Sequence, residues 1–319
     1  MLSSATYREK VGKLLLGKRV LQKLAFTKSF SLYVIASRLR VGMQKTDLAI
    51  LLFLFTIPII CVIIFLQPSS FQEALTAKMN DPNPLTFFTS IFVHGNLDHL
   101  FGKLLIFLFF GSTLYYITRI AKKEKAYLFL LILLFTLLPI LFNAIFLIVL
   151  GSLYQSNISS FGLSLVGAAL IGLVIPSLAA YLKSELENAG SRSFFTFGLF
   201  LLTCSAIVFS YLSSFSIIIS FVGLLVSGCL ISFYSFFKVL HVIPNETKTK
   251  ELKKITLTVI ILFSYFVLLG SLFPSNLVIS EGNVVNIIAH YVGLIFGLTF
   301  GLLFFQHKKL LSTKIALKG

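Results

Sequence analysis

The sequence has few charged residues and long runs that contain none. Of its 319 residues, 12% are charged and 57% are hydrophobic, and the mean hydropathy is +0.97. A soluble globular domain carries about 25% charged residues, so this composition excludes that class. Because apolar runs follow one another with only short breaks, the sequence predicts an all-α polytopic membrane protein with one membrane domain.

Cysteine is also scarce. Cys61, Cys204 and Cys229 all fall inside apolar runs, and no pair has the spacing of a metal site or a disulfide. We therefore interpret all three as free thiols buried in protein or lipid.

Acidic residues number only eleven, and all of them lie in loops or at the ends of apolar runs. An intramembrane aspartyl protease needs two carboxylates at membrane depth, so that class is excluded. The zinc-protease motif HExxH is absent as well. A metal site at His94, Asp98, His99 and His290 stays open as a minor alternative, although His94 and His99 are five residues apart and ligands on one helix face usually sit four apart. We expect neither a metal nor another cofactor.

The net charge of +16 comes largely from an N-terminal arm and from alternate loops. This distribution is typical of membrane topology, so no nucleic-acid partner is expected. Residues 1–46 contain Glu9 as their only acid and lack the features of a cleavable signal peptide. The segment 11–40 could lie as a basic amphipathic helix on an anionic leaflet. We expect the plasma membrane as the location, with a mitochondrial transit peptide as the alternative.

Eight apolar segments are long enough to cross about 30 Å of hydrocarbon. They lie near 47–66, 99–118, 126–150, 159–181, 194–212, 215–237, 255–273 and 284–305. Every second connection is rich in Lys and Arg, which by the positive-inside rule predicts eight spans with both termini cytoplasmic. The expected plan is a basic arm over 1–46, a membrane domain over 47–305 and a basic tail over 306–319.

The outer connection 67–98 is much longer than a turn. It mixes aromatic, proline and polar residues and contains Lys78 as its only basic residue. A connection of this length and composition predicts a structured cap partly embedded at the membrane interface.

Two stripes of small residues recur at helical spacing. One consists of Ser164, Ala168 and Gly172, and the other of His290, Gly293, Gly297 and Gly301. Small residues on one helix face let a second helix approach closely in a membrane. The expected topology runs both segments inward from the outer surface, which places Ser164 and His290 at a similar depth. A histidine beside a serine can take its proton and activate it as a nucleophile, although such a serine taken alone is more often a packing residue bonded to its own helix backbone.

Three segments resemble the rhomboid family of intramembrane serine proteases, in the family's order. FTSIFVHGNLDHLFGK at 88–103 resembles the family's histidine-rich segment, and Gly162-Leu163-Ser164 resembles its nucleophile motif. AHYVG at 289–293, followed by Gly297, resembles the AHxxGxxxG of its last helix. The resemblance covers about 47–182 and 284–305.

The resemblance implies a rhomboid-like helical bundle that cleaves transmembrane protein substrates within the lipid bilayer, near the extracytoplasmic face. Ser164 would be the nucleophile and His290 the general base and acid. The Ser164 N–H and the His99 side chain would hold the oxyanion, and His94 would tie the cap to the second span. No carboxylate would orient His290, so the arrangement is a dyad.

The chain departs from the family pattern at several positions. Lys103 stands where the family has an oxyanion-donating Asn, Leu165 replaces the Gly after the nucleophile, and Ala168 replaces a Tyr that packs on the catalytic His. Leu85-Thr86 replaces the Trp-Arg of the cap. A lysine at this depth is costly; we favour snorkelling to the outer surface over an oxyanion role, which stays open.

The chain also has three expected spans between the serine and histidine helices, where the family has one. The added hairpin lies within 194–273 and preserves the direction of the last span. Two alternatives to a protease remain: a catalytically inactive rhomboid-like protein that binds membrane clients and, less favoured, a transporter.

Overall fold

A computed structural model describes residues 44–78, 83–153, 159–160, 162–185, 192–209, 222–232, 234, 248–272 and 287–306. The expected tail from 307 onward, and all of the arm before residue 44, lie outside the described residues. The chain divides into two compact units, 1–49 and 50–319, and the architecture below is that of the second unit.

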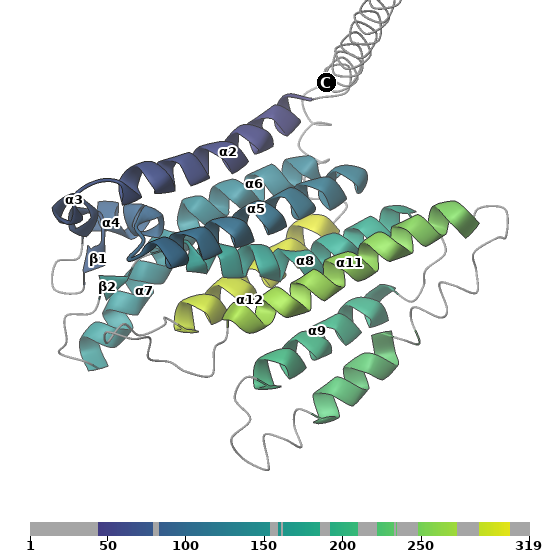
Figure 1. Cartoon of the computed structure of the whole chain (residues 1–319). Coiled ribbons are helices and arrows are strands. Elements are labelled where there is room, and N and C mark those ends of the chain that lie inside the picture. The colour runs from purple at the N-terminus through teal and green to yellow at the C-terminus, as the bar shows by residue number, and fades with distance from the viewer. Residues whose placement is uncertain are drawn as a thin grey trace, which may run out of the picture. The chain divides into compact units, whose positions relative to one another are not determined.

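The described part of the chain is almost entirely helical, and it is an all-α membrane protein (Figure 1). The long helices are α2 (Lys45–Phe65), α5 (Leu97–Ile120), α6 (Glu124–Phe135), α7 (Leu137–Leu153), α8 (Ser164–Glu185), α9 (Arg192–Phe209), α11 (Lys248–Leu272) and α12 (Ile287–Gln306). Among the described residues, five stretches are long and apolar enough to cross a membrane: Lys45–Phe65, Leu97–Ile120, Glu124–Ile145, Ser164–Ser184 and Ile288–Phe305. Shorter apolar helices at Thr196–Ile207, Val222–Ser232 and Lys254–Leu269 occupy the positions of the remaining expected spans.

The apolar segment expected near 126–150 is broken in two. α6 ends at Phe135, Thr136 follows it, and α7 begins at Leu137. Pro139 explains the break, because proline lacks the N–H that would bond the Phe135 carbonyl and its ring crowds that carbonyl.

The connection between α2 and α5 forms a structured cap. It contains α3 (Ser69–Ala74), β1 (Ala77–Lys78), α4 (Pro84–Thr89) and the 3-10 turn η1 (Ser90–Phe92). β1 pairs antiparallel with β2 (Ser159–Ser160), with Ala77 opposite Ser160. This pairing connects the cap by backbone hydrogen bonds to the segment that precedes α8.

α8 is the central helix. In its stretch of membrane-spanning length, 94% of the residues are buried inside the protein. The corresponding share is 44% for Leu97–Ile120 and Glu124–Ile145, and 39% for Ile288–Phe305. A helix that is apolar on all sides is buried in this way when neighbours surround it. Figure 1 shows α5 and α12 running alongside α8 in the same direction, with α11 antiparallel to α12.

Candidate functional site

The two small-residue stripes pack against each other along α8 and α12. A Cβ added at Gly293 would meet the Leu165 carbonyl oxygen and would lie 3.0 Å from the Ala168 Cβ. One added at Gly297 would meet the Ala169 carbonyl, and one at Gly301 would meet Pro176. Later residues of α12 contact later residues of α8, so the two helices are parallel. The helices can approach this closely because the contact positions on α12 are glycines.

This register brings Ser164 and His290 to the same level of the two helices. Ser164 directly precedes Leu165, and His290 lies one helical turn before Gly293. The His290 side chain is 3% exposed, and Ser164 is partly exposed. α8 begins at Ser164, five residues later than the segment expected from the sequence, so the serine occupies the first helical position.

Gly162 adopts a backbone conformation that brings His99 next to the serine segment. Its φ is +101°, and an added Cβ would lie 3.0 Å from His99 Cε1 and 3.6 Å from His99 Nε2. L-residues with a Cβ rarely adopt this conformation. Its backbone N–H donates to the Ser90 carbonyl at 2.9 Å. The glycine two residues before Ser164 therefore supports one side of the His99 ring.

Three helix N-termini converge at the site. His99 is the third residue of α5, Ser164 the first of α8 and His290 the fourth of α12. α5 is parallel to α8, because a Cβ on Gly167 would meet Ile106 at 3.3 Å, further along both helices than the contact between Gly162 and His99. Helix N-termini present positive potential, so this end of the molecule favours a developing negative charge.

The Ser164 backbone N–H lies at the N-terminus of α8. The first hydrogen bond of α8 runs from the Gly167 N–H to the Leu163 carbonyl, at 2.9 Å. The N–H groups of the first helical residues have no carbonyl within their own helix to bond. Ser164 therefore combines a side-chain hydroxyl with a backbone donor at a helix start.

His94 is a buried neighbour of this group. Its side chain is fully buried, its Nδ1 lies 3.2 Å from the Phe92 carbonyl, and its ring centroid lies 5.3 Å from that of His99. Burial, with a smaller contribution from the charge of Lys103, lowers the pKa of His94 to about 4 against a hydrogen bond to Phe92 that raises it. His94 therefore packs as a neutral ring that links the η1 turn to the start of α5.

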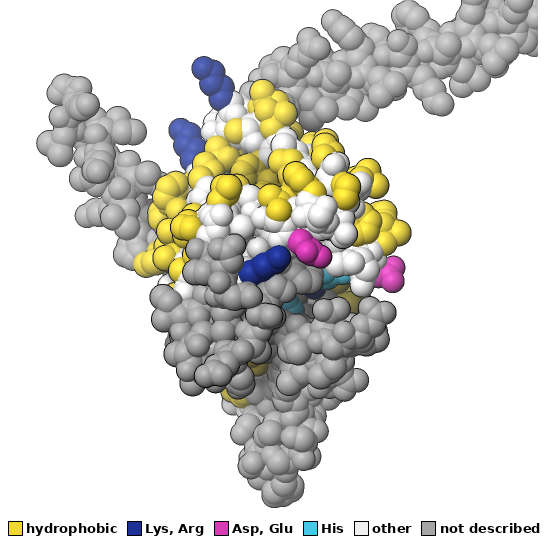
Figure 2. All heavy atoms as spheres, turned by 90° about the vertical axis from the view of Figure 1, so that its left-hand side faces the viewer, with side chains coloured by type: hydrophobic (Ala, Val, Ile, Leu, Met, Phe, Trp, Pro, Cys, Tyr) yellow, Lys and Arg dark blue, Asp and Glu magenta, His cyan; other side chains and the backbone are white. Residues whose placement is uncertain are grey.

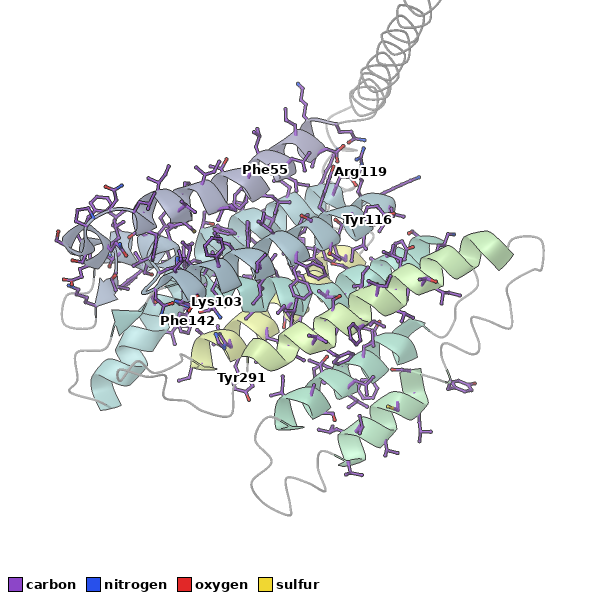
Figure 3. All side chains as sticks on the ribbon, in the orientation of Figure 1. Phe55, Lys103, Tyr116, Arg119, Phe142 and Tyr291 are labelled. Atoms are coloured by element: carbon purple, nitrogen blue, oxygen red, sulfur yellow. The ribbon has the colours of Figure 1, made fainter. Side chains whose placement is uncertain are left out.

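Lys103 lies on α5 one turn beyond His99. Residues four apart share a helix face, and the charge of Lys103 acts on the rings of both His94 and His99. Its side chain is partly buried (Figure 3). The snorkelling interpretation drawn from the sequence and a role for the ammonium beside the histidines both stay predictions.

The structure also shows how the other residues that differ from the family pattern are packed. Ala168 is fully buried, directly opposite Gly293, so a larger side chain would push α12 away from α8. Leu165 is buried as well, and its carbonyl faces Gly293. In the cap, Thr86 is buried and its hydroxyl donates to the Asn83 carbonyl at 2.8 Å, whereas Leu85 is exposed.

Sequence reasoning gave no role to Asn143, a buried amide in α7. Its Nδ2 donates to the Phe87 carbonyl at 2.8 Å and to Ser90 Oγ at 3.2 Å. The only signal in the sequence is an amide inside an apolar run. Asn286, the other such amide, lies outside the described residues.

Figure 2 views the end of the molecule at which α5, α8 and α12 begin, and histidine side chains are visible there between neighbouring atoms. In the part of the chain that the structure describes, no group of three or more His, Cys, Asp or Glu side chains could hold a metal ion. Cys61, Cys204 and Cys229 are free thiols, of which Cys61 is buried and Cys229 exposed.

Comparisons with protein-family models, curated proteins and solved structures give no match to this chain. The resemblance to the rhomboid family therefore rests on the three sequence segments alone.

Proposed function

We propose that this protein is an intramembrane serine endopeptidase that uses a dyad of Ser164 and His290. The observation that carries the proposal is the parallel, glycine-dependent packing of α8 and α12, which aligns the two residues at one level. The contact of Gly162 with His99 adds a third polar group beside the serine.

The residues divide the reaction into two steps. Ser164 Oγ attacks the peptide carbonyl carbon while His290 takes its proton, and the oxyanion is stabilised by the Ser164 N–H, by His99 and by the charge of Lys103. His290 then protonates the leaving amine and an ester remains on Ser164. Water, deprotonated by His290, hydrolyses this ester and releases the carboxyl product.

The proposed substrate is a transmembrane helix that unwinds locally near the extracytoplasmic surface. A peptide carbonyl inside a helix is hydrogen-bonded and shielded, so glycine or another small residue near the cleavage point favours attack. The chain itself would cross the plasma membrane eight times with both termini in the cytoplasm. The alternating basic loops support this, and so do the three shorter apolar helices between α8 and α12.

The direct test is cleavage of a labelled transmembrane substrate by the purified full chain in liposomes. We expect Ser164→Ala and His290→Asn each to reduce cleavage by at least about a thousandfold, the effect typical of losing a catalytic nucleophile or base. Ser177→Ala is the matched control, because Ser177 is a fully buried serine of the same helix and lies three turns from Ser164. Cleavage that survives both dyad variants would exclude the proposal.

The alternative is a catalytically inactive protein that binds membrane clients. Lys103, Leu165 and Ala168 favour it, because each differs from the family pattern beside the dyad. Such a protein would bind the same substrate with equal affinity in the wild type and in Ser164→Ala, and it would cleave it in neither.

A further inference from the structure

A buried hydrogen-bond chain joins α7 to the backbone beside the candidate nucleophile. Asn143 Nδ2 donates to the Phe87 carbonyl at 2.8 Å and to Ser90 Oγ at 3.2 Å. Ser90 Oγ also donates to the Phe87 carbonyl, at 3.4 Å. Asn143 is 2% exposed and Ser90 is 1% exposed, so water does not replace these bonds.

The Ser90 carbonyl is the next link. It accepts from the Val93 N–H at 3.2 Å, which closes the η1 turn, and from the Gly162 N–H at 2.9 Å. Gly162 in turn has a positive φ and lies next to the ring of His99, since an added Cβ would lie 3.0 Å from His99 Cε1. The position of the Ser90 carbonyl therefore affects the backbone at Gly162, two residues before Ser164, and the His99 ring next to it.

We propose that Asn143 is a positioning residue for the candidate site, acting through Ser90 and Gly162. This inference rests on the proposed function. Without the amide, Ser90 Oγ loses its buried donor and the Phe87 carbonyl keeps only the longer bond from Ser90 Oγ, at 3.4 Å. The turn then shifts to recover bonds. A shift of about 1 Å at a catalytic group costs on the order of a hundredfold in rate.

The geometry suggests a specific substitution. Asn143→Leu keeps the shape of the side chain and removes the donor. Aspartate is less suitable, because a buried carboxyl group becomes protonated and could itself donate a hydrogen bond. Thr203→Val is the matched control, since it also removes two buried side-chain hydrogen bonds. These join Thr203 Oγ1 to the Leu199 carbonyl at 2.8 Å and to the Tyr265 hydroxyl at 2.9 Å.

The experiment compares the full-length wild type with Asn143→Leu and Thr203→Val in liposomes. We expect Asn143→Leu to lower kcat for substrate cleavage about ten- to a hundredfold with little change in KM. Hydrogen exchange of the amide of Gly162 should accelerate in the same variant. Thr203→Val should change neither quantity, although it lowers the thermal stability to a similar degree.

Two results would overturn the inference: wild-type kcat in folded Asn143→Leu, or unchanged exchange at Gly162. If Asn143→Leu does not fold, Ser90→Ala tests the same chain by removing Oγ, which accepts from Asn143 Nδ2 and donates to the Phe87 carbonyl. It should accelerate hydrogen exchange at the Gly162 amide, and unchanged exchange there would exclude the coupling between Asn143 and Gly162.

A wild-type protein that does not cleave the substrate would instead contradict the proposed function. The exchange measurement would still test the coupling between Asn143 and Gly162.

Discussion

Gly162 has the most restrictive backbone conformation beside the candidate site. Its φ of +101° is one that residues with a Cβ rarely adopt, and an added Cβ would lie in tight contact with His99 Cε1, at 3.0 Å. We expect Gly162→Ala to destabilise the protein by about 1–3 kcal/mol and to reduce cleavage strongly, because the strain displaces the segment before Ser164. Thermal unfolding and cleavage rates measure the two effects.

The control for that prediction is Gly102→Ala. A Cβ at Gly102 would meet nothing within 4 Å, and alanine favours a helix over glycine by about 1 kcal/mol. Gly102→Ala should therefore be neutral or stabilising and fully active. Full activity in Gly162→Ala would contradict the described backbone geometry.

Lys103 is the residue at which the chain differs most in charge from the family pattern. If its ammonium stabilises the oxyanion, Lys103→Met should lower kcat by about a hundredfold, the loss typical of one removed oxyanion donor. Lys103→Arg should keep more activity, because the positive charge remains. Lys78→Met, a lysine of the cap strand β1, should have no such effect. Wild-type kcat in Lys103→Met would instead support snorkelling.

His94 should make stability depend on pH. Its folded-state pKa of about 4 lies below the ordinary value of 6.5, so the unfolded chain binds a proton in this interval and the folded protein does not. The stability contributed by neutral His94 is complete above pH 6.5 and is lost as the pH falls toward 4, by up to about 3 kcal/mol. Unfolding measured from pH 4 to 8 should show this loss. His94→Asn should flatten the curve over that interval, and an unchanged curve would contradict the assignment.

At the scale of the helices, Gly297 should control the distance between α8 and α12. Its added Cβ would meet the Ala169 carbonyl, a backbone atom that can move only with its helix. We expect Gly297→Ala to destabilise by about 1–3 kcal/mol, the range for overpacking, and to reduce cleavage by moving His290 away from Ser164.

Gly223→Ala provides the comparison, since a Cβ at Gly223 would meet nothing within 4 Å. It should leave both stability and cleavage unchanged. Equal behaviour of Gly223→Ala and Gly297→Ala would mean that the close helix contact does not hold the site together.

The packing of α8 against α12 could be predicted from the sequence, because small residues at helical spacing in a membrane helix allow close packing. The start of α8 was harder to predict, since Ser159 and Ser160 belong to an apolar run but pair with β1 instead of joining the helix. The break after Phe135 follows from Pro139, which the hydropathy of the run conceals.

The site itself was predicted only in part. Local motifs single out Ser164, His290 and His99. The hydrogen bonds from Asn143 to Phe87 and Ser90 join residues more than fifty positions apart, and no periodic pattern in the sequence encodes them. The neighbours of Lys103 likewise depend on how α5 meets the cap, so the sequence alone left its role open.

At the scale of the whole molecule, three parallel helices begin at one end and bring their polar residues together there. α5, α8 and α12 carry His99, Ser164 and His290 in their first turns, within an otherwise apolar protein. The helices between α8 and α12 bring the chain back so that α12 can run parallel to α8.

The most direct measurement of the central claim is labelling of Ser164 by a fluorophosphonate probe, with the modified residue identified by mass spectrometry. The dyad predicts that the wild type is labelled at Ser164 and that His290→Asn lowers the labelling rate by at least about a hundredfold, because the serine loses its base. Equal labelling rates in the wild type and His290→Asn, or no labelling of either protein, would contradict the dyad.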